Sequence, residues 1–315
     1  MRRTIALLSL LVGLSVPGLA NAQKVSIALP VATLESMPIF VAQDKGFFKK
    51  AGIDVDVITS RGGSEAMKAY IAGDVQFAAI GFPEVGLMRE KGVDAELFFA
   101  QCNRVPFALI ARTGSGIKSV KDLKGKTVAV TSPGSLTANI AKYFAMKAGL
   151  DPVKDVHFVS VGGGPGILGA LKSKSADAAM LFEPFVTIAV KQGMATKVVD
   201  VAKELNAFMA APVTTSKGFI DKHPKEAKAI FDALAEAQKY IRSNHDGVME
   251  IAKKRFANAN PAVLASALDT MYGVYSPDGK ISKENLKLTQ EISIQLHIMK
   301  KSYPYDDVVA PMARE

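Results

Sequence analysis

The same order of glycines and prolines occurs twice in this chain, and that repeat is the strongest constraint on its fold. Three pairs of dipeptides share an offset of 101 residues: Gly62-Gly63 with Gly163-Gly164, Phe82-Pro83 with Glu183-Pro184, and Lys91-Gly92 with Gln192-Gly193. A constant offset from position 62 to position 92 indicates an internal repeat. The sequence therefore predicts two similar lobes, one after the other.

Strands and helices alternate within each repeat. In the first repeat, residues 25–29, 53–58 and 75–80 have the composition of strands, and residues 64–72 and 84–91 have the composition of helices. Short turns separate them. This alternation predicts doubly wound α/β lobes with parallel sheets that are covered on both faces.

The stretch from Lys126 to Leu150 shows the pattern of the second repeat most clearly. A short β-branched run at 127–130 predicts a buried strand, and a turn at 132–135 offers helix N-cap chemistry. Apolar residues then recur every four positions from Leu136, which predicts an amphipathic helix that ends at Gly149. A strand that turns sharply into a helix leaves free backbone N–H groups at the helix start.

The first 22 residues have the features of an export signal. Met1-Arg2-Arg3 is basic, residues 5–14 are mostly apolar, and Ala20-Asn21-Ala22 fits an A-x-A cleavage pattern. We therefore expect cleavage after Ala22. Removal of Arg2 and Arg3 lowers the formal net charge from +9 to +7.

Composition excludes several classes of protein. The 39 Lys and Arg residues are scattered, without the basic run of a nucleic-acid binder. Cys102 is the only cysteine, which excludes an intramolecular disulfide and a metal site made of several cysteines. The four histidines are dispersed, and no H-E-x-x-H or G-x-S-x-G motif occurs. We expect no catalytic residue, no metal and no cofactor.

Open α/β lobes bind ligands at the carboxyl ends of their strands, so two facing lobes predict one cleft between them. Two connecting segments, near 101–105 and 206–212, are expected to act as hinges, and a strand is expected at 207–213. The candidate ligand-binding residues are Leu34, Glu35, Met37, Gly63, Ser64, Phe82 and Pro83 on one wall, Thr131, Ser132, Gly134, Ser135, Thr137, Gly163, Gly164 and Glu183 on the other, and Arg104 at the hinge.

Each candidate has an expected role. Backbone N–H groups at Ser135 and Gly164, with hydroxyls near Thr131, are expected to hold an acidic group. Leu34, Met37, Phe82 and Phe182 are expected to supply apolar walls. Arg104 either pairs with a ligand acid or lies at the surface. Glu183 either accepts hydrogen bonds from a ligand or favours its own helix N-terminus.

Residues 164–169 fit the pattern G-x-G-x-x-G and follow a predicted strand. One interpretation is a dinucleotide-binding turn. The other is a nest of backbone N–H groups that approaches a ligand closely, which we favour because the matching turn at 62–64 lacks the pattern.

Longer motifs resemble one known family. Residues 38–48 (PIFVAQDKGFF), 51–55 (AGIDV), 117–126 (IKSVKDLKGK) and 219–224 (FIDKHP) resemble substrate-binding proteins of ABC transporters of the nitrate/sulfonate/taurine type, which share a domain with thiamine-pyrimidine synthesis proteins. The resemblance covers essentially the whole mature chain. It implies a type II periplasmic binding protein, or Venus flytrap, with two similar lobes joined by a two-crossing hinge: lobe 1 at 23–103 and 209–315, lobe 2 at 104–208.

The resemblance also implies a function. The protein would capture a small organic anion, such as a sulfonate, taurine or an aromatic carboxylate, in the periplasm and deliver it to a permease and an ATPase. It would act as a monomer. A receptor for a pyrimidine stays open as the main alternative. A pyrimidine-synthase-like enzyme is disfavoured because its cysteine-rich motif is missing, and a periplasmic sensor is a third alternative.

Overall fold

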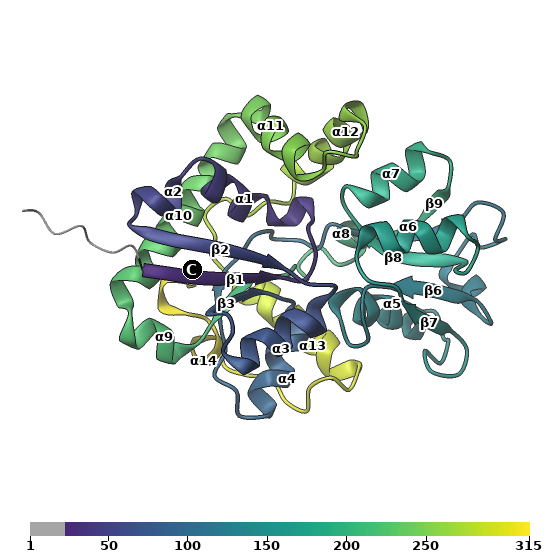
Figure 1. Cartoon of the computed structure of the whole chain (residues 1–315). Coiled ribbons are helices and arrows are strands. Elements are labelled where there is room, and N and C mark those ends of the chain that lie inside the picture. Colours follow the sequence, from purple (N-terminus) through teal and green to yellow (C-terminus); the bar gives the residue numbers. More distant parts are fainter. Residues whose placement is uncertain (1–22) are drawn as a thin grey trace, which may run out of the picture.

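The chain folds into two lobes that lie side by side, each built on one five-stranded sheet. The computed structural model describes residues 23–315, so the predicted signal peptide lies outside the described residues. The chain starts in the first lobe, passes into the second and returns to the first (Figure 1). The predicted two-lobed α/β architecture is confirmed.

The sheet of the first lobe has the strand order β2-β1-β3-β10-β4. Its strands are β1 (Gln23–Leu29), β2 (Ile53–Thr59), β3 (Phe77–Ala79), β4 (Glu96–Phe99) and β10 (Val213–Thr215). The edge strand β2 begins with buried and exposed side chains in alternation, whereas β3 is buried throughout. This difference follows from their places in the sheet, because only a central strand is covered on both faces.

The sheet of the second lobe has the equivalent order β7-β6-β8-β5-β9. Its strands are β5 (Phe107–Arg112), β6 (Thr127–Val130), β7 (His157–Ser160), β8 (Ala178–Phe182) and β9 (Ala195–Asp200).

The internal repeat extends to the register of the strands. Ile27 of β1 pairs with Phe77 of β3, and Val128 of β6 pairs with Ala178 of β8, so both partners differ by 101 residues. The pairing of β1 with β2 matches that of β6 with β7 at the same offset. The repeat predicted from three pairs of dipeptides is therefore a repeat of three-dimensional structure.

The expectation of wholly parallel sheets is wrong. β5 pairs antiparallel with β8 and β9, and β10 pairs antiparallel with β3 and β4. Both strands follow a passage between the lobes, so they enter their sheets at the edge where the parallel strands end, and they must run in the opposite direction. The predicted strand at 207–213 is also wrong, because β10 starts only at Val213.

Helices cover both sheets. The first lobe has α1 (Met37–Asp44), α2 (Phe47–Lys50), α3 (Gly63–Ala72) and α4 (Phe82–Glu90), and the second has α5 (Leu136–Lys147), α6 (Gly164–Lys172), α7 (Phe185–Lys191) and α8 (Val201–Glu204). As predicted, Ser135 caps α5 by accepting a hydrogen bond from Ala138 N, and Gly149 follows its end at φ +83°.

The chain after β10 is mainly helical and packs on the first lobe (Figure 1). Its helices are α9 (Lys217–Lys222), α10 (Pro224–Ser243), α11 (His245–Arg255), α12 (Pro261–Tyr272), α13 (Lys283–Gln295) and α14 (Tyr305–Val308). Helix α13 ends at Gln295, and His297, two residues further on, takes φ +54°. No helix within residues 23–315 has the length and apolar character needed to cross a membrane.

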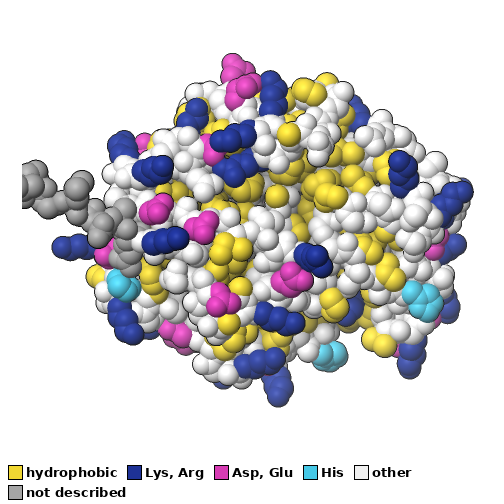
Figure 2. Space-filling view, in the orientation of Figure 1, with side chains coloured by type: hydrophobic (Ala, Val, Ile, Leu, Met, Phe, Trp, Pro, Cys, Tyr) yellow, Lys and Arg dark blue, Asp and Glu magenta, His cyan; other side chains and the backbone are white. Residues whose placement is uncertain are grey.

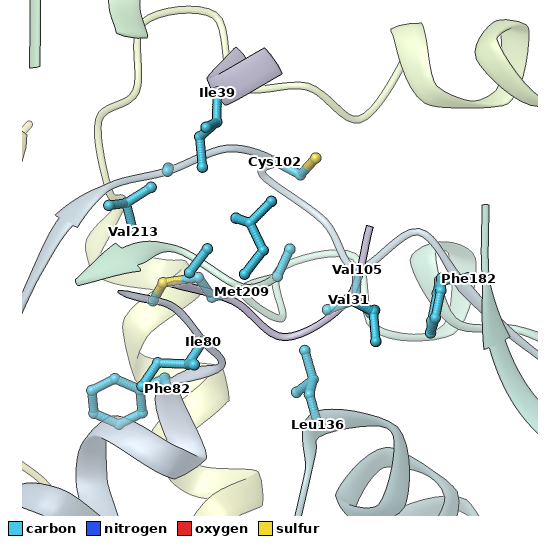
Figure 3. Packing of buried hydrophobic residues seen from close by; sticks show 14 of the residues in the cluster. Val31, Ile39, Ile80, Phe82, Cys102, Val105, Leu136, Phe182, Met209 and Val213 are labelled. Atoms are coloured by element: carbon cyan, nitrogen blue, oxygen red, sulfur yellow. The ribbon is translucent and has the colours of Figure 1, made fainter. Parts of the chain in front are cut away.

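A smaller hydrophobic cluster lies within the second lobe, and a larger one extends through both lobes. The larger cluster includes Ile80 of the first lobe, Leu136 and Phe182 of the second lobe, and Val105 and Met209 between the lobes. Figure 3 shows these side chains gathered where the lobes meet. The lobes are therefore in contact, and the structure is a closed arrangement.

Candidate functional site

A small cavity lies where the two lobes meet the chain segments that connect them. We call these the first crossing (residues 100–106) and the second crossing (residues 205–212). The cavity has a volume of about 40 Å³, which is room for a few water molecules. The lining residues are Pro30, Val31, Thr33, Glu35, Ser36, Gly63, Ala79, Ile80, Gly81, Glu84, Gln101, Phe107, Thr131, Ser135, Leu136, Thr137, Phe182 and Ala211.

Some of the predicted site residues line this cavity. Glu35 and Gly63 come from the first lobe, and Thr131, Ser135 and Thr137 come from the second. Phe182, expected as an apolar wall, lines it as well.

The other predicted apolar walls lie elsewhere. Leu34, Met37 and Phe82 have fully buried side chains that belong to the core rather than to the cavity lining. Pro83 is also buried, in the first turn of α4, and Gly134 is exposed in the turn before α5. For these residues the sequence identified the correct turns but not which side chains face the cavity.

Arg104 does not reach the cavity. Its guanidinium donates a hydrogen bond to the Gly273 carbonyl at 2.6 Å, and Arg104 is not among the residues that line the cavity. Of the two roles expected for it, the structure favours the one without a ligand.

Glu183 supports its own helix. Its Oε2 accepts a hydrogen bond from Thr187 N at 3.1 Å, in the first turn of α7. Burial raises the pKa of this carboxyl, and the hydrogen bonds from Thr187 partly offset that effect. Of the two roles expected for Glu183, the structure favours stabilisation of the helix N-terminus.

Three hydroxyls form a cluster at the start of α5. Thr131 Oγ1 lies 3.0 Å from Ser135 Oγ and 2.9 Å from Thr137 Oγ1. Ser135 Oγ donates to the Ser132 carbonyl and accepts from Ala138 N. The three side chains are thereby fixed in place at one wall of the cavity.

Glu84 lines the cavity, although it was not one of the individual candidates. It lies in the first turn of α4 with 3% exposure, and its Oε1 accepts a hydrogen bond from Leu136 N of the opposite lobe at 3.1 Å. Its Oε2 is buried without a partner in the described chain. Burial raises the pKa of Glu84 to about 8, although the Leu136 N–H lowers it in part. An acid in a first turn usually stabilises its own helix, so the residue type alone does not indicate a role in the cavity.

Glu35 and Gln101 bind the second crossing through the same residue. Glu35 Oε1 accepts a hydrogen bond from Ala211 N at 2.8 Å, and Gln101 Nε2 donates to the Ala211 carbonyl at 2.7 Å. Burial raises the pKa of Glu35 to about 7. Gln101 Oε1 is buried and has no partner in residues 23–315. Gln101 was expected only as part of a hinge.

The charge of the cavity differs from the expectation. Its lining includes two carboxyl groups, Glu35 and Glu84, and no lysine, arginine or histidine. Donors for an acidic ligand group are thus limited to backbone N–H groups and hydroxyls. No cluster of three or more potential metal ligands occurs within the described range 23–315.

Hydrogen bonds across the cleft hold the lobes together. Ser64 Oγ donates to the Pro133 carbonyl and lies 3.3 Å from Ser132 Oγ. Leu34 N donates to the Glu183 carbonyl at 3.1 Å. Two predicted ligand-binding residues, Ser64 and Ser132, therefore contact each other in the closed arrangement.

A second, more open groove lies between the lobes on the other side of Val31. Gly163, Gly164 and Phe185 line it from the second lobe, and Phe256 lines it from the first. The rings of Phe185 and Phe256 are 6.4 Å apart across the lobes. Figure 2 shows hydrophobic side chains gathered in this hollow between the lobes.

The glycines at 163–166 are explained by packing. A Cβ at Gly164 would lie 2.1 Å from the Phe185 ring, and a Cβ at Gly166 would lie 2.0 Å from the Val161 carbonyl oxygen. A Cβ at Gly163 would lie 3.1 Å from Val31 of the other lobe. Gly163 and Gly164 border the outer groove and not the cavity, so they do not form the expected nest of N–H groups around the cavity.

Comparison with known proteins assigns the chain to a family. Residues 33–247 match the protein family described as NMT1/THI5 like. The putative binding protein YtlA of Bacillus subtilis (strain 168) is 26% identical over 292 residues, which cover 91% of this chain and 87% of that protein. The taurine-binding periplasmic protein of Escherichia coli (strain K12) is 27% identical over 236 residues, 72% of this chain and 69% of that protein.

Solved structures agree with this placement. A protein of Bordetella bronchiseptica RB50 has a TM-score of 0.82 at 27% identity, over 94% of this chain and 95% of that one. The periplasmic aliphatic sulphonate binding protein SsuA of Escherichia coli has a TM-score of 0.73 at 18% identity, over 93% and 94%. The predicted periplasmic binding protein fold is confirmed, and so is the resemblance on which it was based.

Proposed function

The chain belongs to the NMT1/THI5-like family, and on that premise we propose that it is the periplasmic solute receptor of an ABC importer. It captures a small organic solute between its lobes and delivers it, as a monomer, to a permease that an ATPase drives. The names of the relatives, which are binding proteins, support binding rather than catalysis.

The observation that carries this proposal is the make-up of the cavity. Both lobes and both crossings contribute to its lining, and hydrogen bonds between the lobes close it. A solute enters such a cavity only when the lobes part, and it then favours the closed form in which it touches both walls. That two-state closure is what a transport receptor needs.

For the solute we propose an organic compound with an acidic group, such as a sulfonate or a carboxylate. The acidic group would face hydroxyls at Thr131 and Thr137 and the backbone N–H groups at the starts of α3 and α5. Taurine and an aliphatic sulphonate occur in the names of similar proteins, which supports this class.

A pyrimidine is the second candidate, and one observation favours it. The cavity wall in the first lobe offers the carboxyl groups of Glu35 and Glu84, which suit the amino group of an aminopyrimidine.

A reversible cross-link tests the closure. Ser64 and Ser132 approach each other across the cleft, and the only natural cysteine, Cys102, is buried. In the double variant Ser64→Cys/Ser132→Cys, we expect oxidation to lock the lobes together. Small-angle X-ray scattering on solute-free protein should then give a smaller radius of gyration for the oxidised form than for the reduced form.

The single variant Ser64→Cys is the matched control, because it cannot form the cross-link. Solutes that raise the melting temperature of the reduced double variant should have no effect on the oxidised form. Equal radii in both redox states, with equal responses to solutes, would contradict a receptor that works by closure.

A further inference from the structure

We propose that Glu84 takes part in capture as a proton donor: its Oε2–H group donates to the acidic group of the solute, so closure of the lobes around an organic anion takes up one proton from water. This inference rests on the proposed receptor function with an organic anion as the solute. It assigns a role to one residue and a pH dependence to the site.

The carboxyl group of Glu84 has one oxygen in use and one without a partner. Oε1 accepts a hydrogen bond from Leu136 N at 3.1 Å, whereas Oε2 is buried and has no partner within residues 23–315. A protonated carboxyl group has one O–H donor beside an acceptor oxygen. Since an N–H group only donates, Oε1 is the acceptor oxygen and the proton belongs on Oε2.

Burial keeps this carboxyl group in its acid form. Glu84 is 3% exposed, and among the described residues that line the cavity there is no lysine, arginine or histidine to pair with a carboxylate. A buried carboxylate without a cationic partner is costly, so the group binds a proton instead. Burial accordingly raises the pKa of Glu84 to about 8, which backbone N–H groups of Glu84 and Leu136 offset only in part.

Neighbouring charges do not oppose this protonation. Glu35 is the one other titratable group among the described residues of the lining, and its carboxyl accepts a hydrogen bond from Ala211 N. No charged side chain is among the causes of the raised pKa of Glu84. The elements packed against α4, and α4 itself, carry charged side chains outside the lining, at Glu65 on α3, Arg89 and Glu90 on α4, Glu96 on β4, Lys142 on α5 and Glu291 on α13.

Glu84 meets the second lobe at its cluster of hydroxyls. Leu136, which donates to Glu84, stands between Ser135 and Thr137 at the start of α5. These two hydroxyls and that of Thr131 line the same cavity. An acidic group bound there accepts hydrogen bonds both from the hydroxyls and from the Oε2–H group of Glu84. A solute without an acceptor leaves that buried O–H group unpaired, which is costly.

The proton is coupled to closure because the hydrogen bond between Glu84 and Leu136 joins the two lobes. When the lobes part, water reaches the carboxyl group, and its pKa returns towards the ordinary value of 4.5. At pH 7 the open form is then ionised and the closed form is protonated. Capture of the anion therefore takes up a proton, and opening releases it again.

Isothermal titration calorimetry tests the proposal on protein that has been unfolded and refolded to remove bound solute. Ethanesulfonate and benzenesulfonate are the probes, because a sulfonate stays ionised and any proton taken up must bind to the protein. Titrations at pH 7 in phosphate and in Tris, which differ in ionisation enthalpy, give the number of protons. We expect about one proton per bound sulfonate, and an affinity that falls about tenfold for each unit between pH 5 and pH 7.

The variant Glu84→Gln isolates the proton. Its amide oxygen can accept the hydrogen bond from Leu136 N and its NH₂ group is still a donor, but it cannot bind a proton. We expect binding without proton uptake, so the affinity of the variant relative to the natural protein should rise about tenfold per pH unit. Glu250→Gln is the matched control, because Glu250 is 71% exposed and pairs with Lys253 on the surface; this variant should keep both the proton uptake and the pH dependence.

The outcomes separate this inference from the proposed function. If the sulfonates bind without proton uptake, the inference is wrong and the receptor function stands. If uptake persists in Glu84→Gln and disappears in Glu35→Gln, the proton belongs to Glu35 and the assignment to Glu84 is wrong. If neither sulfonate binds, the proposed organic anion fails and the inference fails with it, while the cross-linked variant still tests closure.

Discussion

The two lobes have the same strand order and the same register, yet they differ where they face the cleft. At the offset of 101 residues, Glu35 of the first lobe corresponds to Leu136 of the second, and Glu84 corresponds to Phe185. Both carboxyl groups line the cavity, whereas Phe185 lines the outer groove. Both lobes supply apolar groups and hydroxyls to the cavity, but only the first lobe supplies acidic side chains.

The glycines show how one backbone serves both purposes. A Cβ at Gly63 would lie 2.4 Å from Glu84 Oε1, and a Cβ at the equivalent Gly164 would lie 2.1 Å from the Phe185 ring. In each lobe, the glycine at the start of one helix leaves room for a side chain in the first turn of the next helix. The repeat thus provides the frame, and the side chain placed in that space determines the chemistry of the wall.

The acidic wall should make stability depend on pH, and this is the largest effect that we expect. Burial raises the pKa of Glu84 from 4.5 to about 8 and that of Glu35 to about 7. Between pH 4.5 and pH 8 the closed form therefore holds more protons than the unfolded chain, so its stability falls as the pH rises. For Glu84 the loss is on the order of 4 kcal/mol.

Denaturant unfolding of solute-free protein between pH 5 and pH 8 measures this effect. Glu84 faces the Leu136 N–H and Glu35 faces the Ala211 N–H, so neither is stabilised by a cationic partner. The stability of Glu84→Gln should be markedly less sensitive to pH than that of the natural protein. Glu250→Gln, which changes an exposed residue, should keep the pH profile of the natural protein. Equal pH profiles for the natural protein and Glu84→Gln would refute the account of this wall.

Gly164→Ala tests the apolar wall and should have the next largest effect. The new methyl group would overlap the Phe185 ring, which is packed against Phe182 and Phe256 and cannot move freely. We expect a loss of about 2 kcal/mol in the free energy of unfolding. Combined with Phe185→Ala, the change should be much less than additive; additive losses would show that the ring is not the obstacle.

Gly63→Ala is the equivalent change in the acidic wall, and it should be less damaging. The methyl group would meet the far end of a flexible side chain rather than a ring, so a loss of about 1 kcal/mol is expected. Displacement of the Glu84 carboxyl should also weaken its bond to Leu136 N. The variant should therefore be less sensitive to pH as well, and a loss larger than that of Gly164→Ala would argue against the comparison.

Ser64→Ala should have the smallest effect. It removes hydrogen bonds to Pro133 and Ser132 across the cleft, at a partly exposed site, and should cost about 0.5 kcal/mol or less in unfolding. Its main result should be a shift of the solute-free protein toward the open form. Small-angle X-ray scattering measures that shift, and an unchanged profile would mean that this contact does not help to hold the lobes closed.

The helices and the internal repeat were predicted well because they depend on local sequence patterns. Glycines and prolines mark the ends of helices, and apolar periodicity marks the buried faces, so the repeat and helix α5 were predicted correctly. The antiparallel direction of β5 and β10 was not predicted, because it depends on where the chain crosses between the lobes. No local sequence pattern indicates where the chain passes from one lobe to the other.

The site was predicted at the level of turns. Glu35, Thr131 and Thr137 were identified from their positions near strand ends, and they do line the cavity. Glu84 and Gln101 were not singled out as candidates, because their hydrogen bonds depend on partners more than fifty residues away, Leu136 and Ala211. Leu34 and Phe82 were assigned to the cavity because apolar character alone does not distinguish a cavity wall from the core.

Native mass spectrometry of the mature protein tests the central claim most directly. Spectra are recorded for the protein as purified and again after it has been unfolded, dialysed and refolded. We expect the purified protein to carry a small-molecule adduct that is lost on refolding and whose mass identifies the class of solute. A protein that carries no adduct as purified, and that gains none from added taurine, alkanesulfonate or aminopyrimidine, would contradict it.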